Sequence, residues 1–87
     1  MYKKLEPLAG KFKGNEFGSL FDDTTLLMNK IGARHTFNPN DKIEAKYAAM
    51  TDDELIIWYD RTFHMFLACM AAVPYLDFRA EIKMIKR

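Results

Sequence analysis

The clearest pattern of apolar and polar positions lies between Thr51 and Pro74. Residues 51–54 read Thr-Asp-Asp-Glu, which has the spacing of a helix capping box and places three acids in the first helical turn. Large apolar residues then recur every three or four positions, as on one helix face: Leu55, Tyr59, Phe63, Phe66, Met70 and Val73. Proline disfavours helix at the preceding residue and cannot donate a backbone hydrogen bond. The pattern predicts a helix over about 52–73, ended by Pro74, with this stripe in the core.

Two shorter helices are predicted before it. The first starts near Ser19 and ends before Gly32, a residue suited to a left-handed C-cap. The second runs from Asp41 to Met50, with Asp41 as N-cap and Glu44 three residues on, as in a capping box.

The two ends of the chain are less regular in pattern. Residues 1–18 hold three glycines and a proline, so we expect a basic arm there, either flexible or pairing as an edge strand over 8–13. Residues 76–84 alternate strictly between apolar and charged, which favours a strand over 76–85, although good helix formers also allow a fourth helix. In a helix Asp77 and Glu81 would be like-charged neighbours, and this consideration tips the prediction to a strand pairing with 8–13 or the strand-like run 33–37.

These elements define the expected fold. It is mainly α, a small three- to four-helix domain around one long apolar helix at about 52–73. Residues 76–85 are either a β-strand in a minor sheet, which would make the fold α+β, or a fourth helix. The chain shows no repeats and no internal linkers, so residues 1–87 are expected to form a single domain.

The small size of the chain changes the interpretation of the long helix. A chain of 87 residues buries only roughly 60–65% of its unfolded surface, so its core can enclose few helices on all sides. Between Thr62 and Val73 only Thr62 and His64 are polar, which leaves that half of the helix apolar nearly all round. Either the other segments wrap it completely or an apolar surface remains for self-association or a protein partner. The candidate interface residues are Met65, Phe66, Ala68, Cys69, Met70 and Ala72.

Charge is distributed unevenly along the chain. The net charge is +1, but residues 14–60 carry nine acids and four bases, while the segments before and after them are each net basic. If the two ends meet, they would form a positive surface suited to nucleic acid or a nucleotide. The domain nevertheless falls short of the pI above about 9 typical of dedicated nucleic-acid binders. The candidate anion-binding residues are Lys3, Lys4, Lys11, Phe12, Lys13, Lys83, Lys86 and Arg87.

Few residues suggest chemistry. The single cysteine, Cys69, excludes an intrachain disulfide and favours a reducing compartment such as the cytoplasm. The chain has neither a metal-ligand spacing nor a phosphate-binding loop, so no metal site, cofactor or catalytic residue is expected. Asp60 and His64 are four apart and can touch, but a surface pair explains them without catalysis. The longest uncharged stretch, 62–76, is too short for the ~20 residues that span a bilayer.

We therefore expect a small non-enzymatic interaction protein of the cytoplasm, oligomerising or binding a protein partner through the apolar helix 54–73. Chains of this size often act as regulators or inhibitors, including ones encoded by phages. The alternative is an anion-binding module for nucleic acid or nucleotide that uses the basic N- and C-terminal segments.

Overall fold

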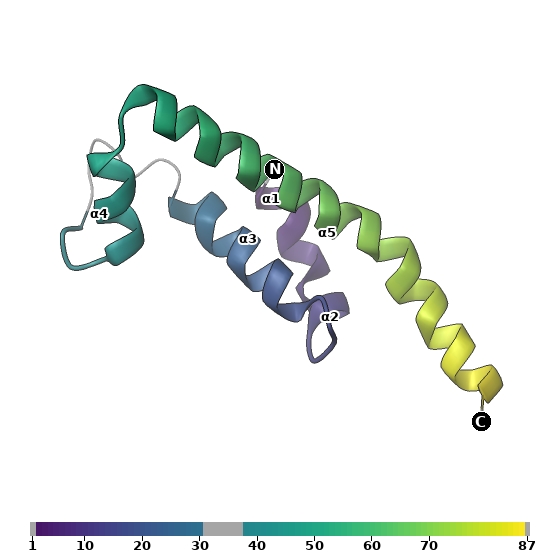
Figure 1. Cartoon of the computed structure of the whole chain (residues 1–87). Coiled ribbons are helices and arrows are strands. Elements are labelled where there is room, and N and C mark those ends of the chain that lie inside the picture. The colour runs from purple at the N-terminus through teal and green to yellow at the C-terminus, as the bar shows by residue number, and fades with distance from the viewer. Residues whose placement is uncertain (1, 31–37, 87) are drawn as a thin grey trace.

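A computed structural model of the chain describes residues 2–30 and 38–86, and every regular element in these residues is helical. In chain order they are α1 (Tyr2–Leu5), a 3-10 turn η1 (Glu6–Leu8), α2 (Ala9–Phe12), α3 (Gly18–Lys30), α4 (Lys42–Ala49) and α5 (Asp52–Lys86), arranged as Figure 1 shows. The mainly α fold is thus confirmed. The strand-like run 33–37 lies outside the described residues.

Helix α5 begins where the capping box predicts, but it does not end at Pro74. The Glu54 backbone N–H donates to Thr51 Oγ1 at 3.2 Å, and the helix continues for 35 residues to Lys86. Pro74 lies on an exposed side of the helix, so it removes one backbone hydrogen bond without displacing a core side chain. The axis of α5 bends in its C-terminal third in Figure 1, as a proline inside a helix leads one to expect.

Of the two alternatives for 76–85, the strand is wrong and the helix agrees with the structure, in which these residues continue α5. Like-charge repulsion between Asp77 and Glu81 was the consideration against a helix, and partners from the N-terminal segment remove it. Lys11 Nζ lies 2.6 Å from Asp77 Oδ1, and Arg79 pairs with Glu16. These ion pairs offset the repulsion that Asp77 and Arg79 would meet from like-charged neighbours on an isolated helix.

The N-terminal residues form neither a strand nor a free arm. Three short helical pieces, α1, η1 and α2, fold back against α3 and α5, and they bury Leu5 and Phe12. The chain turns at Gly14, whose φ of 75° suits glycine. It then passes so close to α2 that a Cβ on Gly18 would lie 3.1 Å from the Phe12 carbonyl oxygen.

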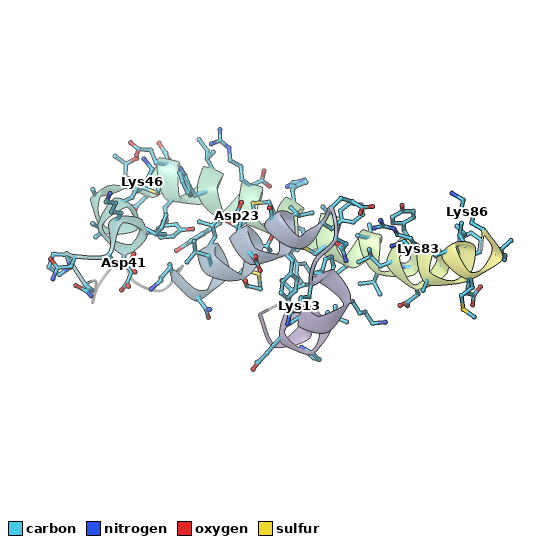
Figure 2. All side chains as sticks on the ribbon, turned by 90° about the horizontal axis from the view of Figure 1, so that it is seen from below. Lys13, Asp23, Asp41, Lys46, Lys83 and Lys86 are labelled. Atoms are coloured by element: carbon cyan, nitrogen blue, oxygen red, sulfur yellow. The ribbon has the colours of Figure 1, made fainter. Side chains whose placement is uncertain are left out.

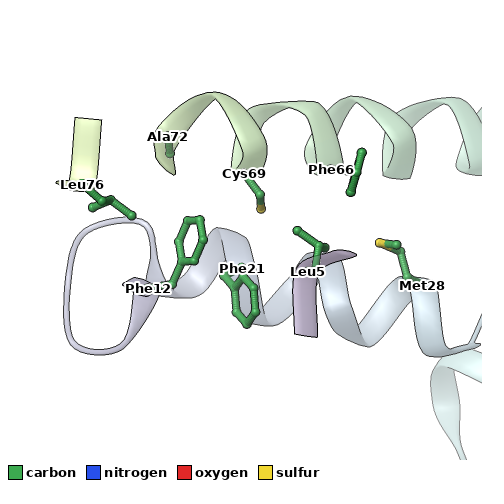
Figure 3. Close-up of a cluster of buried hydrophobic side chains, with 8 residues drawn as sticks. All are labelled: Leu5, Phe12, Phe21, Met28, Phe66, Cys69, Ala72 and Leu76. Carbon is green, nitrogen blue, oxygen red and sulfur yellow. The ribbon is translucent and has the colours of Figure 1, made fainter. Parts of the chain in front are cut away.

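The main core joins this N-terminal segment to α3 and the second half of α5 (Figure 3). The rings of Phe12 and Phe21 stack with centroids 4.7 Å apart. The buried residues of this cluster are Leu5, Phe12, Phe21, Met28, Phe66, Cys69, Ala72 and Leu76. The core is therefore built from both ends of the sequence.

A second, smaller cluster anchors α4 to the start of α5. Tyr47, Met50 and Leu55 are buried there, and the Tyr47 ring meets the edge of Trp58 at a centroid distance of 5.7 Å. Burial raises the pKa of the Tyr47 hydroxyl, an effect that the nearby Thr62 side chain only partly offsets.

The molecule is elongated because α5 is longer than the rest of the fold. A helix of 35 residues is about 52 Å long at 1.5 Å per residue, and the longest dimension of the molecule is 52 Å against 24 and 19 Å for the other two. The radius of gyration is 15.8 Å, compared with about 12 Å for a compact domain of this length. The other helices pack along one side of α5 and do not enclose it (Figure 1).

An ion-pair cluster joins the end of α3 to the start of α4. The Asp41 carboxylate caps α4 by accepting from the backbone N–H groups of Ile43 and Glu44, both at 3.0 Å. Its other oxygen lies 2.8 Å from Lys30 Nζ, which also lies 3.0 Å from Glu44. The Lys30 contact, followed by the backbone donors, lowers the pKa of Asp41 to about 2.

This lowered pKa predicts a specific loss of stability in acid. A carboxyl whose pKa is depressed by folding stabilises the protein above its unfolded value of about 3.9, and the stabilisation is lost as the pH falls through the folded value of about 2. We expect the urea midpoint to fall between pH 4 and pH 2, and to fall less in Asp41→Asn, which keeps a capping acceptor but does not titrate. If the urea midpoints of the two proteins fell in parallel with pH, the loss of stability would not come from Asp41.

Candidate interaction surface on α5

The face of α5 that enters the core is set by residues seven apart. Leu55, Thr62, Cys69 and Leu76 are all buried and follow one line along the helix. The hydroxyl of Thr62 is satisfied within the helix, because it donates to the Trp58 carbonyl at 2.8 Å. The two central residues of this line are therefore Thr62 and Cys69, and neither belongs to the stripe that the sequence predicts for the core.

The predicted interface residues are divided between the core and the surface. Phe66, Cys69 and Ala72 are buried against the N-terminal segment and α3, so they are not available to a partner. Met65 is half-buried, while Ala68 and Met70 are exposed. These six residues therefore do not form one exposed surface, because the helices that precede α5 cover three of them.

A different apolar face of α5 is exposed, and we call it the outer stripe. Its large side chains are between 36% and 63% exposed. Together with the exposed Pro74 they follow steps of three and four residues, so they line one side of the helix. The outer stripe consists of Ile56, Tyr59, Phe63, Leu67, Met70 and Phe78. Tyr59, Phe63 and Met70 belong to the stripe that the sequence pattern assigns to the core, and that assignment is wrong for these three.

The apolar area of the outer stripe is large for so small a protein. A large side chain can bury about 200 Å², so six of them at about half exposure leave roughly 550 Å² uncovered. The largest apolar patch on a typical monomer is about 300–600 Å² and often has a function. The outer stripe is at the upper end of that range.

The outer stripe runs almost parallel to the helix axis. Counting Pro74, its positions repeat in steps of three, four and four, which is an 11-residue period. This period gives about 3.67 residues per turn, close to the 3.6 of an α-helix, so the stripe drifts little around the helix over its whole length. Another helix could follow the part of the stripe that precedes the bend at Pro74.

The polar groups of α5 do not form a catalytic constellation. His64 Nδ1 lies 2.8 Å from the Asp60 carbonyl oxygen and 3.6 Å from its carboxylate, and both side chains are about two thirds exposed. The Cys69 thiol is fully buried, where it donates to Thr24 Oγ1 at 3.6 Å and burial raises its pKa. The buried Cys69 thiol and the exposed His64 imidazole therefore lie apart.

Neither a metal-binding cluster nor a membrane-spanning helix occurs in residues 2–30 and 38–86. No cluster of three or more His, Cys, Asp or Glu side chains in them is arranged to hold a metal ion. None of the helices that these residues form has the length and apolarity to cross a bilayer.

The basic ends of the sequence do meet, in part. Lys11, Lys13 and Lys83 line one open hollow of about 240 Å³ between the end of α2 and the C-terminal third of α5, together with Arg79. Figure 2 labels Lys13 and Lys83, on the segment after α2 and on α5 respectively. The charge pattern alone does not single out Arg79, but its spacing of four from Lys83 places the two on one side of the helix.

The other predicted anion-binding residues are not in this hollow. Phe12 is a core residue, and Lys4 and Lys86 are exposed away from it. The side chain of Lys3 and the whole of Arg87 lie outside the part of the chain that the structure describes.

Comparison of the chain with protein-family models, with curated proteins and with solved structures gives no match in any of the three.

Proposed function

We propose that this chain is a non-enzymatic interaction protein that self-associates through the outer stripe of α5. The observation that carries the proposal is the exposure of six large apolar side chains along one side of a single helix. Exposing apolar area of this extent to water is unfavourable, and the free energy falls when a partner covers it.

The area agrees with what a dimer requires. Two copies of the outer stripe in contact would bury about 1,100 Å² of apolar surface, above the roughly 1,000 Å² expected of a specific interface. A two-fold arrangement lets the same patch serve both copies, so no second surface is needed. The nearly axial course of the stripe lets two α5 helices contact each other over most of their length.

A role as a cytoplasmic regulator or inhibitor is compatible with this proposal. The buried thiol of Cys69 is the only cysteine and requires no oxidising compartment. In such a role the dimer would present two copies of every other surface to its target.

The decisive test is the oligomeric state of two double variants. Phe63→Asp/Leu67→Asp places two charges in the centre of the outer stripe, and we expect it to raise the dimer dissociation constant at least about 100-fold, because unpaired charges would be buried. Sedimentation velocity over a range of concentrations measures this. The matched control is Ile57→Asp/Ala68→Asp, which adds the same charges at exposed positions on another side of α5.

We expect the wild type and the control to dimerise equally and the stripe variant to remain a folded monomer by circular dichroism. A wild type that stays monomeric at several hundred micromolar would contradict self-association. Equal dissociation of both variants would show that the contact does not lie on the outer stripe.

A further inference from the structure

The hollow between α2 and α5 is lined by more positive charges than its neighbouring carboxylates neutralise. Four basic side chains line it, and two of them are neutralised by neighbours: Lys11 by Asp77, and Arg79 by Glu16. Lys13 and Lys83 are exposed and have no ion-pair or hydrogen-bond partner among the described residues. Two unpaired positive charges therefore face a shared space.

The walls of the hollow supply shape and further donors. The remaining lining residues are Gly14, Asn15, Leu76 and Ala80, which are small or uncharged. The Asn15 side chain is held in place, since it donates to the Lys11 carbonyl at 2.7 Å and accepts from the Phe17 N–H at 2.9 Å. Arg79 uses one nitrogen for Glu16, and a guanidinium has five N–H donors, so several remain.

The volume and the charge together define the ligand. A space of about 240 Å³ is smaller than the roughly 300–1,000 Å³ of pockets for drug-sized molecules, so it suits a small group rather than a whole organic ligand. Lysine and arginine side chains combine in phosphate recognition, the first as point charges and the second through a planar fork.

We propose that this hollow binds a phosphate-bearing anion with at least two negative charges, held between Lys13 and Lys83 and by the donors of Arg79 that Glu16 leaves unused. The phosphates can come from a free polyphosphate chain or from a nucleic-acid backbone that passes across the hollow. The site is independent of the outer stripe, because Lys83 lies about 160° around α5 from Phe63. A dimer formed through the outer stripe would leave both hollows open.

The test uses two probes, inorganic tripolyphosphate and a single-stranded DNA of about ten nucleotides, titrated into ¹⁵N-labelled protein at low salt. We expect the largest amide shifts at Gly14, Asn15, Ala80 and Lys83. Binding should weaken with salt with a log–log slope of about −2 to −3, because each phosphate contact contributes roughly 0.7–0.9. Tripolyphosphate binding alone identifies a small polyphosphate as the ligand class, and binding of DNA alone identifies a nucleic-acid backbone.

The variants separate this site from general attraction to a basic surface. Lys13→Gln/Lys83→Gln should weaken binding about tenfold or more and reduce the salt slope by about 1.4–1.8. Lys13→Arg/Lys83→Arg should retain it. The matched control Lys42→Gln/Lys46→Gln removes two exposed lysines of α4 and should leave affinity unchanged. Absence of binding to both probes at low salt, or an equal loss in the control, would overturn the proposal.

Discussion

Replacing Phe12 by alanine should lower the free energy of unfolding by about 3–5 kcal/mol, the usual cost of removing a buried aromatic ring. Phe12 is only 1% exposed, stacks on Phe21 and lies among the residues of α5 that form the main core (Figure 3). A domain of this size has a total stability of roughly 4–13 kcal/mol, so the loss is a large part of it. The melting temperature should fall by more than about 12 °C.

Thermal unfolding followed by circular dichroism, at one fixed protein concentration, measures this effect. The control is Met84→Ala, which shortens a large apolar side chain that is exposed on α5 outside the outer stripe and should cost less than about 0.5 kcal/mol. If the two variants melt together, the N-terminal segment is not part of the core.

Replacing Pro74 by alanine should stabilise the protein by about 1–3 kcal/mol. Proline in a helix interior is about 3 kcal/mol less favourable than alanine, because it removes a backbone hydrogen bond and clashes with the preceding turn. Pro74 lies inside α5 with its ring exposed, so alanine restores the helix without leaving a cavity. The gain is smaller than the full difference if the bend fits the main core.

Urea unfolding gives the change in free energy, and Pro74→Gly is the matched comparison. Glycine also restores the hydrogen bond but is about 1 kcal/mol less favourable than alanine in a helix, so its gain should be smaller by that amount. A loss of stability in Pro74→Ala would mean that the bend itself positions Val73 and Leu76 in the core.

The sequence pattern predicts the helix starts well because they depend on neighbouring residues. The N-caps Thr51 and Asp41 accept the backbone hydrogen bonds that their spacing predicts. The start of α3 at Gly18 also agrees with its prediction, while the end predicted before Gly32 lies outside the described residues. The end of α5 could not be predicted in this way, since it depends on Leu76 packing in the core and on ion pairs with residues more than sixty positions away.

The direction in which α5 faces the core was equally inaccessible from periodicity. A helix that is apolar nearly all round gives only a weak preference for one side, and the largest side chains dominate that preference. The core face has Thr62 and Cys69 at its centre, which carry little weight in such a pattern. The N-terminal segment selects this side because its bulky Leu5 and Phe12 fill the space beside small residues.

In the hollow between α2 and α5, too, some features follow from the sequence and others depend on the tertiary fold. The uneven distribution of charge marks both ends of the sequence as basic, but that Lys11, Lys13 and Lys83 line one hollow follows only from the fold. Which charges remain unpaired depends on Asp77 and Glu16, whose pairing follows from the tertiary fold.

The main core, built from both ends of the sequence, also affects how the protein is made. A ribosome adds Leu5 and Phe12 more than fifty residues before Cys69 and Leu76. Until Leu76 has left the exit tunnel, the apolar N-terminal segment has no partner to cover it. Closing so long a loop is slow compared with forming the local helices. During that interval the nascent chain carries its future core residues uncovered, and a chaperone can bind them.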